Sequence, residues 1–509
     1  MGKHIINQTN LNKTIRYLRK NGIRHAYYAA RERLEEAKNN NYRYIEPDRE
    51  TLRKQREASA KLPYRFSIVV PAYETKETYL REMMDSVMKQ SYDNWELLIA
   101  DASKSGRVRA IIKEYSKHLR HNAAQSEGRQ SIRYLHLPGN LGISENTNAG
   151  IREAGGDYIG LLDHDDLLAP DALYEMARHI KTAVIENRDI EYFPVLLYSD
   201  EDKYENGDED KNSECYNSGS DGTGSVYMEP NRKKEFNLDL ILSNNYICHF
   251  LVVRSKEMKE LLLRKEYDGA QDYDLVLRIV GKLWDNSLNN GTCANEPGSY
   301  ILHVPRVLYH WRCHAESTAQ NTGSKEYAYE AGRRALEDFG RRRGWRIKVT
   351  HGLHLGFYQV SYLPDIFAVR PEVGMIGGRI LDRHNKIVSG IYDESEEKLY
   401  VGLHREYSGG STHTASMVQD CAAVDIRCLR LRKELQMLFE ELLGFPYVEK
   451  GKWRTADVSF LSCDEEGYRK LSLTLGEEIR RKGYLVLWDP GITEKLPIKY
   501  NLNLIKRGD

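Results

Sequence analysis

The chain has 509 residues, which is too long for one ordinary hydrophobic core, so we expect two or three domains. Its 75 Lys and Arg residues balance its 75 Asp and Glu residues, so no overall charge favours nucleic acid, and any attraction to a membrane must be local. No apolar run approaches the roughly 20 residues that span a bilayer, and no signal-peptide core is visible. With seven cysteines and no Cys-x-x-Cys pair, we expect a soluble cytoplasmic protein without a disulfide scaffold.

Residues 1–60 show no strand pattern and are rich in charge, which predicts a helical N-terminal extension. The first part of this extension mixes basic with aliphatic side chains: Lys13, Ile15, Arg16, Leu18, Arg19, Lys20, Ile23 and Arg24. One interpretation is peripheral association with an anionic membrane surface, at the inner face of the cell membrane. The other is a solvated helix that packs on the next domain.

From Phe66 onward, short apolar strands alternate with amphipathic helices. Apolar residues at the i, i+3, i+4 spacing of a helical face follow the first strand: Leu80, Met83, Met84, Val87 and Met88. Strands are predicted at 66–70, 95–100, 132–137 and 158–162, with helices at 80–88, 108–119 and in the residues leading to Ile151. This order predicts an α/β fold whose mostly parallel sheet is covered on both faces.

Downstream, the pattern is interrupted once and then resumes. Residues 205–229 are rich in Gly, Ser, Asn and Asp, which predicts a surface insertion. After it, a helix is predicted to begin near Leu275, and 300–309 is predicted to form a strand.

Part of this pattern recurs beyond residue 350. Residues 423–433, 471–475 and 484–488 are similar to 247–256, 275–279 and 304–309, in that order. We interpret the similarity as a partial internal duplication. The alternative is a chance likeness between two α/β segments.

Three carboxylates end the strand predicted at 158–162. Asp163 and Asp165 would project to one side at the strand's carboxyl end, where open α/β sheets bind ligands. Two acids held together favour a hard divalent cation such as Mg²⁺ or Mn²⁺, shared with substrate phosphates. The alternative is a solvated turn in which an Asp caps the helix that begins near Pro170.

In combination, four segments resemble the inverting family 2 glycosyltransferases. Residues 66–73 (FSIVVPAY) are similar to the family's first strand and nucleotide loop, and 96–103 (ELLIADAS) to its second. Residues 140–150 (NLGISENTNAG) resemble the segment before the metal motif, and 162–166 (LDHDD) the metal motif itself. Glu74 departs from the pattern, because Asn is usual there.

The resemblance implies a GT-A catalytic domain, which is a Rossmann-like fold with a mostly parallel sheet. It also implies a metal-dependent, hexosyltransferase-like activity that requires Mn²⁺ or Mg²⁺. Nucleotide-sugar-binding roles are implied for Pro71, Ala72, Tyr73, Glu74, Asp101, Asn148, Asp163 and Arg312. Metal-binding roles are implied for Asp163, Asp165 and His310.

A transferase of this kind also needs a carboxylate that accepts the proton of the acceptor hydroxyl. In the segment GAQDYDL at 269–275, Asp272 takes the place of that base in the resemblance. The alternative reading makes Asp272 a helix cap and Asp274 a first-turn acid favoured by the helix dipole. His249 and Trp311 are candidates for contacts with the acceptor sugar.

These inferences divide the chain into an N-terminal extension (1–60), a catalytic domain (61–345) and a degenerate, partly GT-A-like C-terminal domain (346–509). The C-terminal unit has GYRK at 467–470 in place of QDYD at 271–274, so we expect it to be noncatalytic and to serve as an acceptor platform, a homodimer surface or a dock in a glycan-assembly complex.

The predicted function is transfer of a sugar from a nucleotide-diphosphate donor to a hydroxyl of a growing cell-surface polysaccharide or lipid-linked glycan. The alternative is a noncatalytic scaffold subunit of a glycan-assembly complex.

Overall fold

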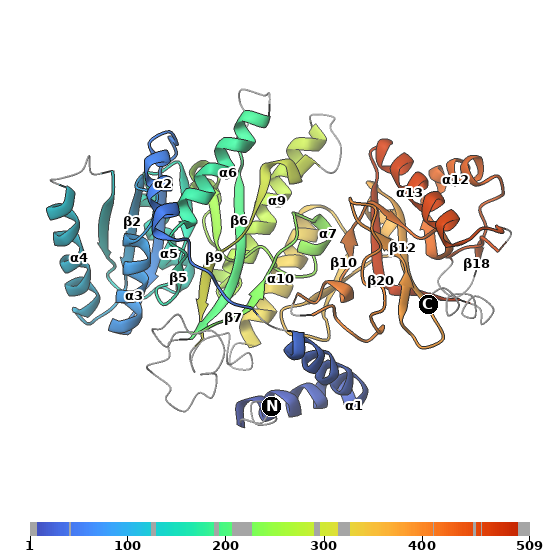
Figure 1. Ribbon diagram of the computed structural model, residues 1–509, viewed down its shortest axis with the longest axis horizontal. Coiled ribbons are helices and arrows are strands. Elements are labelled where there is room, and N and C mark those ends of the chain that lie inside the picture. The colour runs from blue at the N-terminus through green and yellow to red at the C-terminus, as the bar shows by residue number, and fades with distance from the viewer. Residues whose placement is uncertain are drawn as a thin grey trace.

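The computed structural model describes residues 8–39, 42–123, 129–187, 193–205, 226–289, 296–313, 326–410, 412–450, 455–459 and 461–496. A large α/β unit and a smaller C-terminal unit lie side by side, and the first helix lies along one edge of the molecule (Figure 1). Of the insertion predicted at 205–229, residues 206–225 lie outside the described part of the chain.

The large unit is built on a nine-stranded sheet within the described residues, with the order β3-β2-β1-β4-β8-β6-β9-β5 and β7 beside β6. Its first part contains β1 (Phe66–Ala72), β2 (Trp95–Asp101), β3 (Ser131–His136) and β4 (Tyr158–Leu161), which are all parallel. Here the predicted strands are confirmed to within about two residues, because each alternates with a strongly periodic helix.

The remainder of the sheet is mixed, whereas the sequence predicted a mostly parallel sheet. It contains β5 (Leu167–Leu168), β6 (Leu196–Glu205), β7 (Val226–Asn231), β8 (Leu251–Arg254) and β9 (Ile301–Arg312). Strand β8 runs antiparallel to both β4 and β6, and only the β6–β9 pair is parallel in this part. The α/β class is correct, but the parallel order ends at β4.

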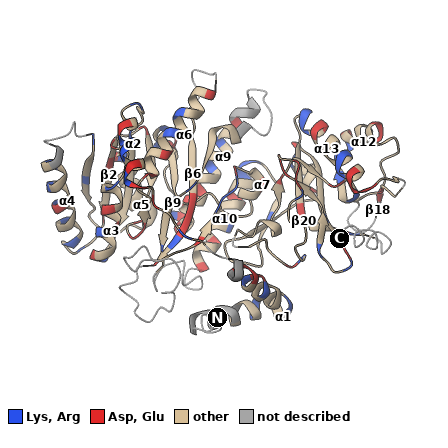
Figure 2. Ribbon diagram, viewed as in Figure 1, with Lys and Arg blue, Asp and Glu red and all other residues tan. Residues whose placement is uncertain are grey.

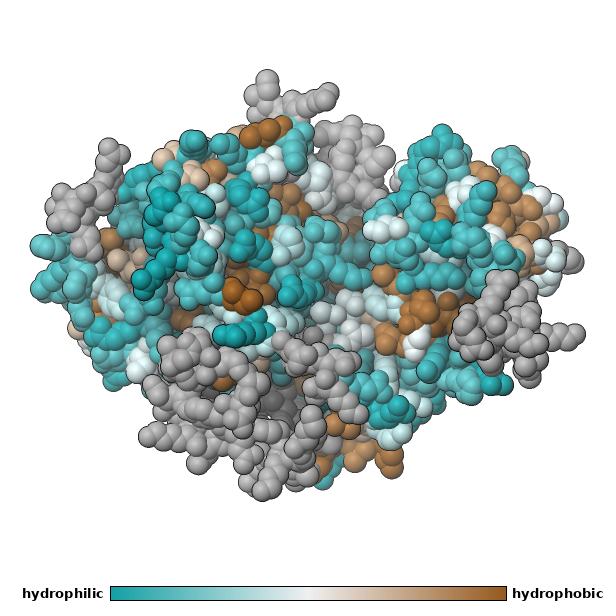
Figure 3. All heavy atoms as spheres, in the orientation of Figure 1, coloured by the Kyte–Doolittle hydropathy of each residue, from teal (hydrophilic) through white to brown (hydrophobic). Residues whose placement is uncertain are grey.

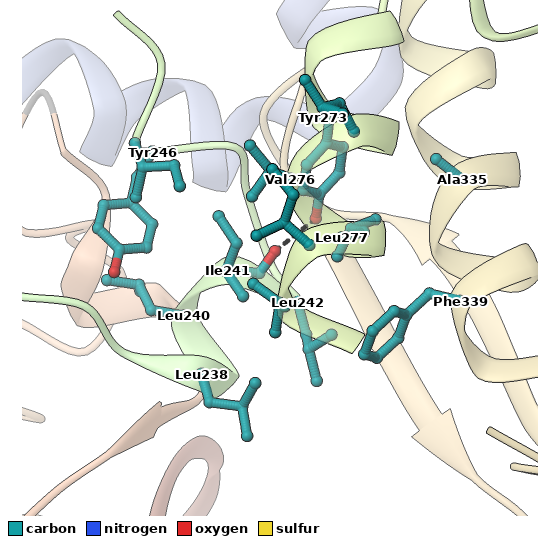
Figure 4. Packing of buried hydrophobic residues seen from close by; sticks show 14 of the residues in the cluster. Leu238, Leu240, Ile241, Leu242, Tyr246, Tyr273, Val276, Leu277, Ala335 and Phe339 are labelled. Atoms are coloured by element: carbon teal, nitrogen blue, oxygen red, sulfur yellow. Dashed lines mark hydrogen bonds between the residues drawn. The ribbon is translucent and has the colours of Figure 1, made fainter. Parts of the chain in front are cut away.

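Helices cover both faces of the sheet. They are α2 (Arg49–Ser59), α3 (Glu77–Met88), α4 (Arg107–Ala123), α5 (Ile143–Glu153), α6 (Ala172–Glu186), α7 (Leu238–Ile241), α8 (Ser255–Leu261), α9 (Gln271–Asn289) and α10 (Glu326–Arg342). Because side chains alternate along a strand, Ile68 packs into one core and Val69 into the other. On the Val69 side, α9 packs against α10 and α7, and the hydroxyl of Tyr273 donates to the carbonyl of Ile241 at 2.6 Å (Figure 4).

The N-terminal extension is helical, as predicted, but it does not pack as one block. Helix α1 (Gln8–Asn39), kinked at Gly22, lies against the C-terminal unit, where the side chain of Glu32 accepts backbone N–H groups from residues 408–410. Helix α2 packs on the large unit, where the side chain of Gln55 accepts a hydrogen bond from the hydroxyl of Ser91. None of the helices in the described ranges combines the length and apolar composition needed to cross a bilayer.

The C-terminal unit carries a smaller mixed sheet of β13, β12, β20, β15 and β17. The helices and strands of the whole unit are β10 (Ile347–His351), β11 (Tyr358–Tyr362), α11 (Ile366–Val369), β12 (Val373–Leu381), β13 (Ile387–Ser389), β14 (Ile391–Tyr392), β15 (Gln419–Asp420), β16 (Ala423–Val424), β17 (Leu429–Leu431), α12 (Gln436–Leu443), β18 (Glu449–Lys450), β19 (Thr455–Ala456), α13 (Glu465–Arg481) and β20 (Leu485–Lys495).

This smaller sheet repeats the arrangement around β6. Strand β6 pairs antiparallel with β8 along its first half and with β7 along its second, while β9 runs parallel along its other edge. Strand β12 has β17, β13 and β20 in the same three places and directions. A helix precedes the parallel strand in both units, α9 before β9 and α13 before β20. The shared arrangement supports the internal duplication.

The pairing also sets the register of the repeat. Leu196 and Met375 hold equivalent places, because each begins the pairing with β8 or β17. Through these strands, Val486 corresponds to Ile301, so the likeness inferred between 484–488 and 304–309 is out of register by several residues.

Candidate active site

The parallel strands bring several predicted site residues to one edge of the sheet. In the pairing of β1 with β2, Ala72 lies opposite Asp101, and both end their strands. On the other side of β1, Val69 lies opposite Leu161, so the loop after β4 starts at the same edge. The carboxyl edge of the sheet thus collects the first loop, Asp101 and the acids at 163–166.

The loop after β1 is tied to the loop after β2. Pro71 and Ala72 end β1, and the side chain of Tyr73, 46% exposed, offers an accessible ring. Glu74 has a left-handed backbone (φ 48°), and its N–H donates to Ser103 Oγ at 2.7 Å. The carboxylate of Glu74 accepts hydrogen bonds from the N–H of Lys104 and the hydroxyl of Ser105. This unusual residue therefore holds the shape of the loop rather than leaving it mobile.

Two of the predicted nucleotide contacts are buried and already bonded. Asp101 is fully buried and accepts from the N–H of Ser103 and the hydroxyl of Tyr134, at 2.9 and 2.8 Å. Asn148, on α5, bonds both the N–H and the carbonyl of Leu263 at 2.8 Å. Because both ends of its amide are occupied, Asn148 anchors the segment before α9, a role that sequence reasoning did not assign to it.

The acids after β4 divide into accessible and buried groups. Asp163 and Asp165 keep partial solvent access, whereas Asp166 is buried. Asp166 accepts from the hydroxyl of Tyr309 at 2.5 Å and from the N–H of Arg312 at 2.7 Å. Asp166 therefore fixes the loop to β9, and it leaves the other two carboxylates to face outward.

The carboxylates crowd one another. Burial raises the pKa of Asp163, and the neighbouring charge of Asp165 raises it further. Asp272 contributes in the same direction, although it lies more than a hundred residues away in sequence. A cation or a proton at Asp163 and Asp165 would relieve this repulsion.

Asp272 and Asp274 occupy different environments at the start of α9. Asp274 is fully buried and forms ion pairs with Arg264 and with Arg278, the latter at 2.9 Å. Asp272 keeps partial access, and its Oδ2 accepts from the amide of Asn245 at 2.9 Å. Asp274 is therefore structural, while the geometry leaves Asp272 able to meet an acceptor.

His249 and Trp311 lie together beside these acids. The ring of His249 stacks on Tyr309, with centroids 4.8 Å apart, and lies 5.9 Å from the ring of Trp311. Both the backbone N–H and Nδ1 of His249 bond the carboxylate of Glu201, at 2.9 and 3.0 Å. Burial alone would lower the pKa of His249, but Cys248 and Glu201 outweigh it and raise that pKa well above its ordinary value.

His310 is not brought to the other predicted metal ligands. Along β9, Tyr309 and Trp311 face His249, so His310 points to the opposite face of the sheet. There its Nδ1 bonds Asp202 at 2.6 Å, and its ring lies between Tyr44 and Tyr227. The predicted metal-binding role of His310 does not fit this position.

Arg312 is likewise committed within the protein. Its Nε donates to the carbonyl of Asp165 at 2.5 Å, and its guanidinium pairs with Glu82 and lies over the ring of Tyr79. The side chain is 2% exposed, so Arg312 braces the acidic loop from behind. A direct contact with a diphosphate is not part of this arrangement.

Sequence reasoning missed the acids at the end of β6, which Figure 2 shows as a run of acidic residues along that strand. Asp200 bonds His303 at 2.9 Å, Glu201 bonds His249, and Asp202 bonds His310. The signal was present, because an apolar strand that stops in three acids is the same pattern that identified 162–166.

The residues fit a divalent ion only if the substrate completes the coordination. No group of three or more His, Cys, Asp or Glu side chains is arranged to hold a metal in the part of the chain that the structure describes. Asp163 and Asp165 are a crowded, partly accessible pair, and Mg²⁺ or Mn²⁺ sites commonly combine one or two carboxylates with substrate phosphates.

Comparisons with known proteins find similarity to glycosyltransferases. The model described as Glycosyl transferase family 2 matches residues 67–260. An O-antigen biosynthesis protein, RfbC, of Myxococcus xanthus is 32% identical over 322 residues, which cover 62% of this chain and 21% of the relative. An uncharacterized protein of Sinorhizobium fredii is 34% identical, and the match covers 56% of this chain and 26% of the relative. The chain thus spans about a quarter of the length of these two relatives.

A shorter relative is covered more fully. The putative colanic acid biosynthesis glycosyl transferase WcaA of Escherichia coli is 26% identical over 47% of this chain and 72% of its own length. Among solved structures, residues 1–349 of TarS from S. aureus, in complex with UDP-GlcNAc, are 16% identical, with a TM-score of 0.34 over 53% of this chain and 65% of that one.

Proposed function

Residues 67–260 belong to glycosyl transferase family 2, and from this premise we propose that the protein is an inverting glycosyltransferase. It moves a sugar from a nucleoside diphosphate donor to a hydroxyl of a growing cell-surface polysaccharide or lipid-linked glycan. The observation that supports the proposal is the crowding of Asp163 and Asp165, both partly accessible, in a place where the charge of Asp272 also raises the pKa of Asp163.

In the proposed reaction, Asp272 accepts the proton of the acceptor hydroxyl while that oxygen attacks the anomeric carbon. Asn245 donates to Oδ2 of Asp272 and so holds this carboxylate in place. A base positioned in this way contributes about 10² to 10⁴ in rate. His249 and Trp311 line the acceptor side, where aromatic faces suit a sugar ring.

On the donor side, the loop from Pro71 to Glu74 receives the nucleoside, with the accessible ring of Tyr73 against the base, while the buried Asp101 holds the neighbouring loop through Ser103. Asp163 and Asp165 would hold a divalent ion, Mg²⁺ or Mn²⁺, which supplies positive charge for the departing diphosphate when bound. Asp166 and Arg312 keep these two carboxylates in position through the loop that they share.

The acceptor class rests on the relatives. Two of them carry names that refer to O-antigen and colanic acid biosynthesis, which are surface polysaccharides. A polysaccharide hydroxyl is therefore the acceptor that we propose for this chain.

The central test is Asp272→Asn. Nucleotide sugars are first screened by thermal shift with and without Mn²⁺, since a ligand at 100 times its dissociation constant adds about 2.7 kcal/mol. The variant is expected to retain donor binding and to lose at least a hundredfold in transfer rate, because only the proton acceptor is removed.

The matched control is Asp285→Asn, on the same helix, whose carboxylate is 68% exposed and pairs with Arg343. It should leave both binding and transfer unchanged. Near-normal transfer by Asp272→Asn would overturn the base assignment, and a wild-type protein that binds no nucleotide sugar would point to a scaffold instead.

A further inference from the structure

Helix α1 has two faces with different chemistry. After its kink at Gly22, Tyr28 stacks on His404 with ring centroids 4.3 Å apart, and Glu32 is buried against residues 408–410. The opposite face carries Ile23, Tyr27 and Leu34, which expose 80%, 55% and 46% of their surface. An aliphatic residue left 80% exposed on an otherwise docked helix has no partner within the described chain.

Charge is divided between the same two faces. Within Gln8–Asn39, Lys and Arg outnumber Glu by eight to three, although the whole chain is neutral. Glu32 binds the loop at 408–410, and Glu35 accepts from the hydroxyl of Tyr407. Of the exposed basic residues, Arg24 pairs with Glu406 and Arg31 with Glu35. Further exposed basic side chains lie beside the apolar ones: Arg19, Lys20 and Arg33.

The chain that follows α1 reaches the large unit. Three residues beyond the end of α1, the hydroxyl of Tyr42 donates to Asp202 of β6 at 2.7 Å, on the face of the sheet that also carries His310. In Figure 1, α1 lies on the side toward which β6 and β9 point, and Figure 3 shows apolar residues at that lower edge. A surface bound by α1 would therefore lie on the side of the molecule toward which these two strands run.

We propose that the exposed face of α1, formed by Ile23, Tyr27 and Leu34 with the neighbouring basic residues, docks on an anionic lipid bilayer. Helices that lie in a membrane interface bury apolar side chains between the lipids and place Lys and Arg beside the anionic headgroups. Because the whole chain is neutral while α1 has an excess of Lys and Arg, this binding is local. Where the proposed function holds, the docked helix brings the site to lipid-linked acceptors.

The test is flotation of the full-length protein with vesicles, which requires neither donor nor acceptor. Binding is expected with phosphatidylcholine vesicles that contain phosphatidylglycerol, and not with phosphatidylcholine alone, and salt should weaken it. Arg19→Glu combined with Lys20→Glu should lower the partition coefficient at least tenfold, and Ile23→Ser combined with Leu34→Ser should do the same. All four side chains are exposed, so folding should be retained.

Matched controls lie far from α1. Lys113→Glu on α4 and Ile185→Ser on α6 change exposed residues of the same kinds and should leave vesicle binding intact. The proposal is overturned if the α1 variants float like the wild type, or if neutral vesicles bind equally well. It is also overturned if the wild type is a dimer that Ile23→Ser combined with Leu34→Ser makes monomeric, because a second copy then covers the face. Binding of the nucleotide-sugar donor is measured separately, so failure of the membrane proposal can be distinguished from failure of the proposed function.

Discussion

Two ion pairs on neighbouring strands differ in their exposure. The side chain of Lys233 is fully buried and lies 3.8 Å from Glu201, which is 10% exposed. Lys203 and Glu229 also form an ion pair, but their side chains are 28% and 57% exposed. The buried pair also supports His249, so its chemistry extends to the candidate active site.

Glu201→Gln is expected to lower the free energy of unfolding by about 3 kcal/mol or more, because it leaves the ammonium of Lys233 buried without its charge partner. Glu229→Gln should change it by less than about 1 kcal/mol, as exposed pairs contribute little. Urea unfolding at neutral pH measures both. Equal effects of the two substitutions would contradict the distinction.

The same pair predicts a pH dependence. Burial would raise the pKa of Glu201, but Lys233 and His249 hold it at about 2. A carboxyl whose pKa is lowered on folding stabilises the protein above its unfolded pKa and loses that contribution as the pH falls toward the folded value. The stability gap between wild type and Glu201→Gln should therefore be full near neutral pH and shrink between about 4.5 and 2. A gap that widened on acidification would exclude this account.

At the residue scale, the sequence predicts ligand-binding carboxylates only where they lie in a recognisable motif, as at 162–166 and 269–275. Asp163, Asp165 and Asp272 are predicted in this way, and the charges of Asp165 and Asp272 both raise the pKa of Asp163. It could not reveal that His310 points to the opposite face, because the direction of a side chain depends on the exact register of β9. Nor could it reveal Asn148 as an anchor, since its partner is the backbone of a distant residue.

At the scale of elements, the attachment of α1 includes one side chain with many hydrogen bonds. The carboxylate of Glu32 accepts from the N–H groups of Ser408, Gly409 and Gly410 and from the hydroxyl of Ser408, all within 3.0 Å. Hydrogen bonds to a charged group contribute about 1.5–3 kcal/mol each in favourable cases. An ion pair and a ring stack at other positions of α1 contribute as well, so Glu32 carries part of the attachment.

Glu32→Ala should weaken the attachment of α1 to the C-terminal unit while the rest of the chain stays folded. Limited proteolysis is expected to cleave within residues 8–39 at least ten times faster than in the wild type. The contribution of the sheets to the far-UV circular dichroism spectrum should be unchanged. Glu50→Ala on α2 removes an exposed acid and serves as the control. An unchanged cleavage rate would show that other contacts hold the helix.

The elements best predicted were those with strong periodicity. Strands β1 to β4 and helices α3 to α5 follow an alternation that the apolar spacing dictates. Strand β6 was not predicted, because its second half consists of acidic and polar residues that rank low in strand propensity. Pairing with β7, β8 and β9 overrides that local preference, and only tertiary structure supplies such partners.

At the scale of the whole molecule, the two units share a core and a buried ion pair. One hydrophobic cluster contains Tyr273 and Val276 from the catalytic unit together with Val373 and Leu487 from the C-terminal unit. Across the same boundary, the fully buried guanidinium of Arg370 binds both carboxylate oxygens of Asp239. The two units are thus expected to unfold together.

Arg370→Met tests this coupling. It leaves the carboxylate of Asp239 buried beside Asp420 without a counter-charge, and loss of one partner of a buried pair costs about 3–5 kcal/mol. Calorimetry should show one transition for the wild type and two for the variant. Arg341→Met, whose side chain is 78% exposed, should melt like the wild type. A single, unshifted transition in Arg370→Met would refute the coupling.

The half-sheet built around β6 recurs around β12 with its hydrogen-bonding scheme preserved, although Arg379, Ile380 and Leu381 stand where the first copy has Asp200, Glu201 and Asp202. The strands thus pair in the same way whether or not these positions carry acids. The second copy therefore keeps the framework without the acids. Because Ile380 and Leu381 are fully buried, grafting the acidic triplet onto β12 would require counter-charges as well, such as those that His249 and Lys233 supply to Glu201 in the first copy.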